Sequence, residues 1–149
     1  MNNNVSTYND FIILLKGLDF NNPLLPLVFL SIFLSILFLQ SGFDKILDFN
    51  GNLQFLNTHF KKTIFKNIVM LLLLSIIFLE VITACVFIVG IFQFIFSITF
   101  TISFLKLGVI LSTITICCLF LGQRIAKDYD GAANLTIYFI LTLLGFLFF

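Results

Sequence analysis

The sequence predicts an all-α membrane protein: a four-transmembrane-helix up-down bundle with an amphipathic first loop that lies on the membrane surface. Three observations predict this fold. Of the 149 residues, 60% are hydrophobic and only 10% are charged, whereas soluble domains carry about 25% charged residues. Mean hydropathy is +1.17. The apolar residues gather in four runs, and a helix needs about 20 of them to cross a bilayer.

The first apolar segments are predicted from length and proline placement. Residues 8–19 are expected to form a short interfacial helix, because their apolar run is too short to span and charged residues follow it. The first span is predicted over residues 24–41. Pro23 and Pro26 fit its opening turns, where a missing N–H costs little. Gly42 is expected to end the helix in a left-handed cap.

The first loop, residues 43–63, is the longest polar connection, yet apolar residues recur along it. This pattern is typical of helices that lie in the membrane interface. Asn50 and Gly51 form a turn signal. The loop is therefore predicted to form two short amphipathic pieces that divide at this turn.

The rest of the chain is predicted to cross the membrane three more times. The sequence that follows the first loop is apolar almost without interruption as far as residue 122, which is too long for one helix. A reversal is expected near Gly90 and residues 97–103. The remaining spans are therefore predicted over residues 66–90, 104–122 and 132–149, within a single four-span domain.

Charge predicts the orientation. Most cations of the connections belong to the first and third loops: Lys45, Lys61, Lys62, Lys66, Arg124 and Lys127. The opposite side has Lys16, Lys106 and the α-amine. The positive-inside rule places the first and third loops in the cytoplasm and both termini outside, in a multi-pass protein of the cytoplasmic (inner) membrane. A net charge of +1 gives no basic patch for nucleic acid, so the lipid bilayer is the first expected partner.

Glu80 is the candidate functional residue within the spans. A charged side chain at the centre of a membrane helix costs roughly 2.5–3.5 kcal/mol, so an acid there is by default a functional hypothesis. Glu80 could bind a polar head-group, relay a proton or pair with a partner's cation. Alternatively, it is neutral and hydrogen-bonds a hydroxyl on a neighbouring helix. The candidates for that hydroxyl are Ser35, Thr113, Thr115, Thr136 and Tyr138. No Lys, Arg or His of this chain is expected at the same depth.

Polar residues at the cytoplasmic ends of two spans form a second candidate site. They are Gln40, Asp44 and Lys45 after the first span, and Gln123, Arg124, Lys127, Asp128 and Asp130 after the third. Up-down order brings the two groups to one membrane face. A polar cleft there could accept an anionic or quinone-type head-group. Alternatively, self-neutralising pairs such as Asp44 or Asp128 with Arg124 anchor the helix ends.

The cysteines and small residues indicate packing. There is no C-x-x-C motif. Cys85 and the adjacent Cys117 and Cys118 are expected to differ in depth by roughly 15–20 Å, whereas a disulfide needs Cα atoms within about 7 Å. We therefore interpret all three as small apolar packing residues. Gly108 and Ser112 form a small-xxx-small pair, which predicts close helix approach.

His59 is the only histidine. One histidine without cysteines or carboxylates beside it cannot make a zinc or haem site within one chain. His59 is therefore interpreted as a polar residue of the interface, and no metal site is predicted.

Three stretches resemble the DoxX family of small four-helix membrane proteins. Residues 38–51, FLQSGFDKILDFNG, resemble the exit of that family's first span, where a glycine, an acid and a lysine follow the helix. In this chain those residues are Gly42, Asp44 and Lys45. Residues 79–90, LEVITACVFIVG, are similar to its second span, and residues 122–133, GQRIAKDYDGAA, to its third loop.

The resemblance implies an integral membrane subunit that is non-catalytic by itself and associates with other membrane or redox proteins. No cofactor is expected in this chain. One alternative is a quinone-linked oxidoreductase membrane subunit, with quinone held in a head-group pocket near Gln40, Glu80 and Arg124. Another is a small-solute transporter that uses Glu80 as a proton relay. The chain has few ionisable groups with which to run a reaction alone.

Overall fold

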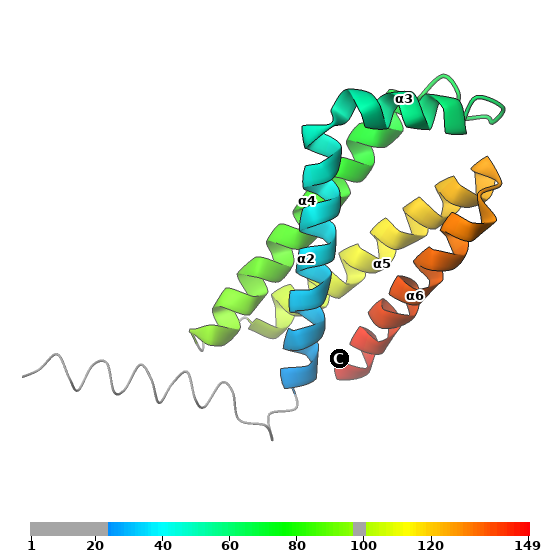
Figure 1. Ribbon diagram of the computed structural model, residues 1–149. Coiled ribbons are helices and arrows are strands. Elements are labelled where there is room, and N and C mark those ends of the chain that lie inside the picture. Colours follow the sequence, from blue (N-terminus) through cyan, green and yellow to red (C-terminus); the bar gives the residue numbers. More distant parts are fainter. Residues whose placement is uncertain (1–23, 97–100) are drawn as a thin grey trace, which may run out of the picture.

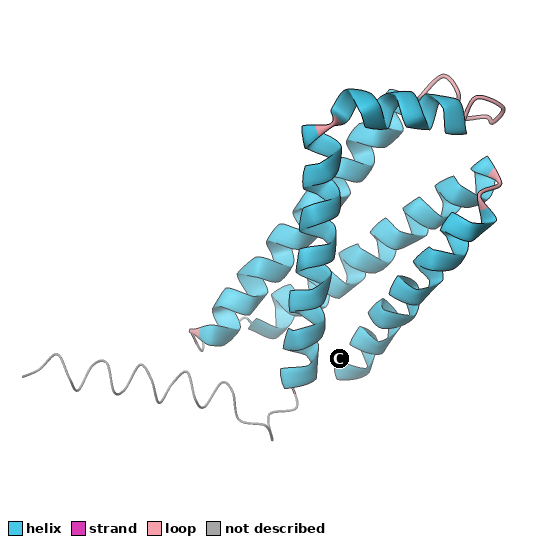
Figure 2. Ribbon diagram, in the orientation of Figure 1, coloured by secondary structure: helices cyan, strands magenta, loops and turns pink. Residues whose placement is uncertain are grey.

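The computed structural model describes residues 24–96 and 101–149, and in this part of the chain the regular elements are all helices, without strands (Figures 1 and 2). The elements are α2 (Leu25–Leu47), α3 (Phe49–His59), α4 (Val69–Ile95), α5 (Thr101–Ala126), α6 (Tyr129–Gly145) and the 3-10 turn η1 (Phe146–Phe148). The all-α prediction is confirmed for these residues. The interfacial helix predicted over residues 8–19 lies outside them.

Four of the helices are long and apolar enough to cross a membrane: α2, α4, α5 and the continuous stretch formed by α6 and η1. Large hydrophobic side chains point outward from each of them, as Phe29, Phe78, Ile114 and Ile137 do. A monomeric soluble protein rarely exposes large contiguous apolar surface. The fold is therefore consistent with a multi-pass membrane protein.

Helix α4 lies between α2 and α5, while α6 packs mainly against α5 (Figure 1). Helices α4 and α5 run antiparallel, because Gly90 contacts Leu105 whereas Thr83, further toward the α4 start, contacts Thr115. Helices α2 and α6 approach each other only where the C-terminal end of α6 meets the start of α2. At the opposite end, α3 runs across the end of α2 toward α5 and α6 (Figure 1).

The tightest packing lies between α4 and α5. A Cβ added at Gly108 would come within 2.5 Å of the Phe87 ring, and one at Gly90 within 2.7 Å of Leu105. Phe87 and Leu105 are completely buried. The close approach predicted for Gly108 is confirmed. The reversal was predicted near Gly90 and residues 97–103. Gly90 instead lies inside α4, which continues to Ile95, while α5 begins at Thr101 within the second predicted region.

The first long helix also continues past its predicted end. Gly42 is an interior residue of α2, which extends to Leu47. A Cβ at Gly42 would lie 3.1 Å from Val81 Cγ2. The glycine therefore serves the contact between α2 and α4 and does not cap the helix. This extension places Lys45 on the last turn of α2.

The amphipathic first loop contains one helix, α3, rather than the predicted two pieces. The chain turns at Asp48, whose side chain accepts a hydrogen bond from Gly51 N at 3.0 Å and caps the start of α3. Asn50 and Gly51 lie within the first turn of α3, so the prediction of a break there was wrong. An aspartate in the N-cap position stabilises a helix start, and this capping interaction outweighs the turn preference of Asn-Gly.

Candidate functional site

Glu80 is held by a lysine and a serine of α2. Lys45 Nζ donates to Glu80 Oε1 at 2.9 Å and to Oε2 at 3.0 Å. Ser41 Oγ donates to Glu80 Oε1 at 2.9 Å and accepts from Lys45 Nζ at 2.6 Å. The Glu80 side chain is 1% exposed and that of Lys45 is 20% exposed. These three residues, Ser41, Lys45 and Glu80, form a closed polar cluster that we call the ion-pair cluster.

The geometry of α2 explains how Lys45 reaches Glu80. Helical side chains tilt toward the helix N-terminus, so Lys45 bends back over the preceding turn, where Ser41 O also accepts its proton at 3.2 Å. Gly42 brings α4 close, with Glu80 Cβ 3.6 Å from the position of an added Cβ. Because α2 ends five residues after Gly42, Glu80 lies about 7–8 Å inside that end.

The expectation that no cation lies at the depth of Glu80 was therefore wrong. It assigned Lys45 to a loop beyond Gly42, whereas α2 continues and carries the lysine inward. The hydroxyl partner comes from Ser41, which was not among the candidate residues. A glutamate bonded to a lysine and a serine carries compensated charge, which lowers the cost of placing it between apolar helices.

A second polar group joins α3 to α5. His59 Nε2–H donates to Gln123 Oε1 at 3.0 Å, and the same Nε2 lies 3.9 Å from Asp128 Oδ2. The His59 ring also stacks on Phe55 of α3, with 5.4 Å between ring centroids. Asp128 caps α6 by accepting from Gly131 N at 2.9 Å. His59, which was predicted to be a polar residue of the interface, contacts residues of α5 and the N-cap of α6 at this end of the bundle.

The other predicted site residues do not converge. Gln40 and Asp44 are exposed on α2, and the Arg124 guanidinium lies over the Tyr129 ring at 4.7 Å. The predicted pairs of Arg124 with Asp44 or Asp128 do not occur among the described residues. The Arg124 guanidinium lies over the Tyr129 ring, five residues later in the chain. The Asp128 carboxylate caps the start of α6.

A cavity of about 260 Å³ lies beneath α3, between α3, α4 and α5. We call it the α3 chamber. Its roof includes Phe60 and Phe65, whose rings meet edge to face at 5.9 Å. Four polar side chains border its largely apolar interior: Lys45, His59, Ser75 and Gln123. The chamber therefore lies between the ion-pair cluster and the His59–Gln123 contact. The chamber is not the predicted head-group pocket, because its lining residues do not include Gln40, Glu80 or Arg124.

A second cavity, of about 300 Å³, lies between α5 and α6, where Ile116, Phe120 and Phe139 line it with Cys117 and Thr136. It carries no charged side chain and lies away from both polar groups. Within residues 24–96 and 101–149, no three His, Cys, Asp or Glu side chains gather closely enough to hold a metal ion.

The three cysteines differ from their expected role. Cys85, Cys117 and Cys118 are free thiols on exposed helix surfaces. They were interpreted as packing residues, but the buried faces of α4 and α5 are occupied by other small residues such as Ala84 and Ser112. Each cysteine therefore faces the surroundings of the bundle or one of its cavities.

No protein-family model, curated protein or solved structure matches the chain. The resemblance to the DoxX family therefore remains a prediction from the short stretches that carry it. The chemistry of the site follows from the residues themselves. The ion-pair cluster has its donors and acceptors satisfied internally, and the α3 chamber offers an apolar volume with a polar border.

Proposed function

We propose that the protein is a DoxX-like integral membrane subunit, non-catalytic by itself, that associates with other membrane or redox proteins. In this proposal α2, α4, α5 and the α6–η1 stretch cross the cytoplasmic membrane in up-down order. The α3 end, where the lysines and arginine gather, faces the cytoplasm, as the positive-inside rule favours. Both termini then lie outside.

The observation that carries the proposal is the closed ion-pair cluster. Among the described residues, Glu80 has the one buried charged side chain. Lys45 and Ser41 donate hydrogen bonds to its carboxylate. A general acid or base must reach its substrate's proton within hydrogen-bonding distance. Glu80 instead joins α2 to α4, which supports a structural role.

The same geometry ranks the alternatives. A proton relay through Glu80 requires the carboxylate to leave Lys45 during each cycle, and removing one member of a buried pair is costly. A quinone pocket near Gln40, Glu80 and Arg124 requires these three side chains to converge. Gln40 is instead exposed, Glu80 is buried, and Arg124 lies over the Tyr129 ring. The subunit proposal needs neither rearrangement, and the exposed apolar helix faces offer it ample surface for association.

Co-purification from the native membrane tests this proposal. A tagged copy and an untagged copy of the chain are expressed together and extracted in mild detergent, and the tagged species is weighed by native mass spectrometry. We expect a stoichiometric membrane or redox protein to remain bound. Retention of the untagged copy alone identifies self-association. A monomer without protein partners, found in both mild detergent and lipid nanodiscs, contradicts the proposal.

A further inference from the structure

The α3 chamber has the size and lining of a site for one hydrocarbon chain. Its volume of about 260 Å³ falls just below the roughly 300–1,000 Å³ typical of sites for whole drug-sized ligands. It exceeds the roughly 150 Å³ of an apolar cavity that stays dry and takes up benzene. Leucines and isoleucine of α4 and α5 line it, including Leu73, Ile76 and Leu119. A segment of an acyl chain matches both the volume and the lining.

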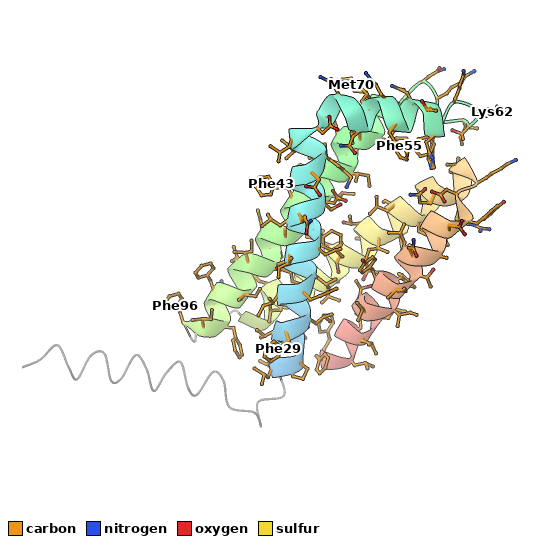
Figure 3. All side chains as sticks on the ribbon, in the orientation of Figure 1. Phe29, Phe43, Phe55, Lys62, Met70 and Phe96 are labelled. Atoms are coloured by element: carbon orange, nitrogen blue, oxygen red, sulfur yellow. The ribbon has the colours of Figure 1, made fainter. Side chains whose placement is uncertain are left out.

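The loop after α3 supplies the charge for a headgroup. Lys61, Lys62 and Lys66 are all exposed. Lys61 and Lys62 follow Phe60, and Lys66 follows Phe65, the two phenylalanines named above for the chamber roof. Figure 3 shows Lys62 at the tip of this loop, pointing away from the helices. The three lysines therefore belong to the segment that carries the chamber roof, and none of them lines the chamber.

Thr63 fixes the shape of this loop. Its Oγ1 donates to Phe60 O at 2.9 Å and accepts from Phe65 N at 3.1 Å, while its own N–H also donates to Phe60 O at 2.9 Å. These bonds tie the two roof aromatics to one compact turn. The backbone of the lysines between and after them is therefore held next to the two roof aromatics.

The exposed apolar side chains near the loop indicate contact with a bilayer interface. Ile64 is 81% exposed between two of the lysines, and Phe55 is 62% exposed although it also lines the chamber. Figure 3 shows Phe55 on the side of α3 that faces α5. Apolar side chains interleaved with cations are typical of segments that lie among anionic lipid headgroups.

We propose that the α3 chamber holds a segment of one acyl chain of an anionic phospholipid, whose phosphate is bound by Lys61, Lys62 and Lys66. This inference rests on the membrane insertion in the proposed function, but it needs no protein partner. In this proposal the α3 chamber binds the hydrocarbon of the lipid, and the lysines of the loop after α3 bind its negatively charged headgroup. Each lysine near a membrane surface contributes about a fivefold preference for anionic lipid at low salt.

Native mass spectrometry of the chain released from nanodiscs that contain equal amounts of phosphatidylglycerol and phosphatidylcholine tests the site. We expect the wild type to retain one phosphatidylglycerol in preference to phosphatidylcholine. The variant K61Q/K62Q/K66Q is expected to lose this preference, whereas Lys106→Gln, at the opposite end of α5, keeps it. Equal retention of the two lipids by the wild type, or a preference unchanged in the triple variant, overturns the proposal.

A second variant tests the chamber independently of charge. A Cβ added at Gly122 meets only Phe60 Cζ, at 3.6 Å, so Gly122→Leu extends a side chain into the volume with little backbone strain. We expect it to release both lipids, while Gly122→Ala retains phosphatidylglycerol. Undiminished retention in Gly122→Leu, or retention of a different apolar molecule in place of phospholipid, overturns the proposal. A chain that fails to enter nanodiscs refutes membrane insertion itself, which is a distinguishable result.

Discussion

The two ends of the helix bundle are built differently. Toward the C-terminal end of α4, glycines let α4 and α5 approach until Phe87 and Leu105 fill the space between them. Toward α3 the same two helices are separated by a cavity, and polar side-chain contacts join each of them to another helix. His59 and Gln123 connect α3 to α5, and the ion-pair cluster connects α2 to α4.

The difference teaches where a membrane bundle can hold a ligand. Transmembrane helices associate through van der Waals packing of small residues and through interhelical hydrogen bonds. The glycine-packed end uses the first device and leaves no space. The α3 end adds the second: beside the Gly42–Val81 contact, polar atoms join α2 to α4 and α3 to α5. An apolar volume persists there between α3, α4 and α5. Variants of each device should therefore have separable effects.

The largest effect is expected from breaking the ion-pair cluster. Glu80→Ala leaves the Lys45 charge unpaired beside α4, which should lower the free energy of unfolding by about 3 kcal/mol. Equilibrium unfolding in mixed micelles measures this change. The double variant Lys45→Met/Glu80→Leu should recover most of the loss, because it leaves no buried charge. An exposed acid of α2, tested as Asp44→Ala, should change stability by less than about 0.5 kcal/mol. Equal effects of Glu80→Ala and Asp44→Ala would contradict the assigned role.

Alanine substitutions of two glycines of α5 should have different effects on stability at the two ends of the bundle. Gly108→Ala places a methyl group against the buried Phe87 ring and should cost about 1–3 kcal/mol. Gly122→Ala, at the chamber end of the same helix, should be neutral or stabilising by up to about 1 kcal/mol, since alanine is the better helix former. The same unfolding assay compares the two. If both substitutions cost the same, the ends do not differ in packing as described.

Removing the cap of α3 should loosen the chamber roof alone. Asp48→Ala deletes the acceptor of the Gly51 N–H and should destabilise α3 by about 1 kcal/mol. Hydrogen exchange of residues 49–59 is expected to accelerate, while exchange within α4 and α5 stays as in the wild type. Acceleration spread evenly over all helices would show that α3 is not a separable element.

The smallest effect is expected at the contact between α3 and α5. A double-mutant cycle of His59→Ala and Gln123→Ala should give a coupling energy of about 0.5–1.5 kcal/mol, as for a typical protein hydrogen bond. A coupling energy within error of zero would mean that stacking on Phe55, and not the hydrogen bond, places His59.

The helices were predictable because hydropathy reports them directly. A run of about 20 apolar residues predicts a long helix whatever that helix packs against. All four long helices lie where such runs occur. The predicted ends of the first two spans, at Gly42 and Gly90, were wrong. A glycine can end a helix, or it can lie inside a helix and let a neighbouring helix approach closely. The sequence does not distinguish these two uses, because the second depends on Val81 or Leu105 lying opposite.

The ion-pair cluster was only partly predictable. Glu80 and Lys45 were both selected as candidates, but their contact depends on the relative register of α2 and α4, which hydropathy does not encode. The spacing of Ser41 and Lys45, four residues apart on one helix face, is a local signal that could have been used. For His59 no local signal exists, since its partner Gln123 belongs to a distant helix.

Thiol labelling tests the central claim, that the long helices lie in hydrocarbon, most directly. Cys85, Cys117 and Cys118 are exposed on helix surfaces. Cys117 and Cys118 also line the two cavities, so Cys85 is the thiol that lipid alone can shield. In nanodiscs, a membrane-impermeant maleimide is expected to leave all three unmodified, while a cysteine introduced by Asn57→Cys on α3 reacts readily. Denaturation in SDS should then make the native thiols reactive. Rapid labelling of Cys85 in the nanodisc would place the centre of α4 in water and contradict the account.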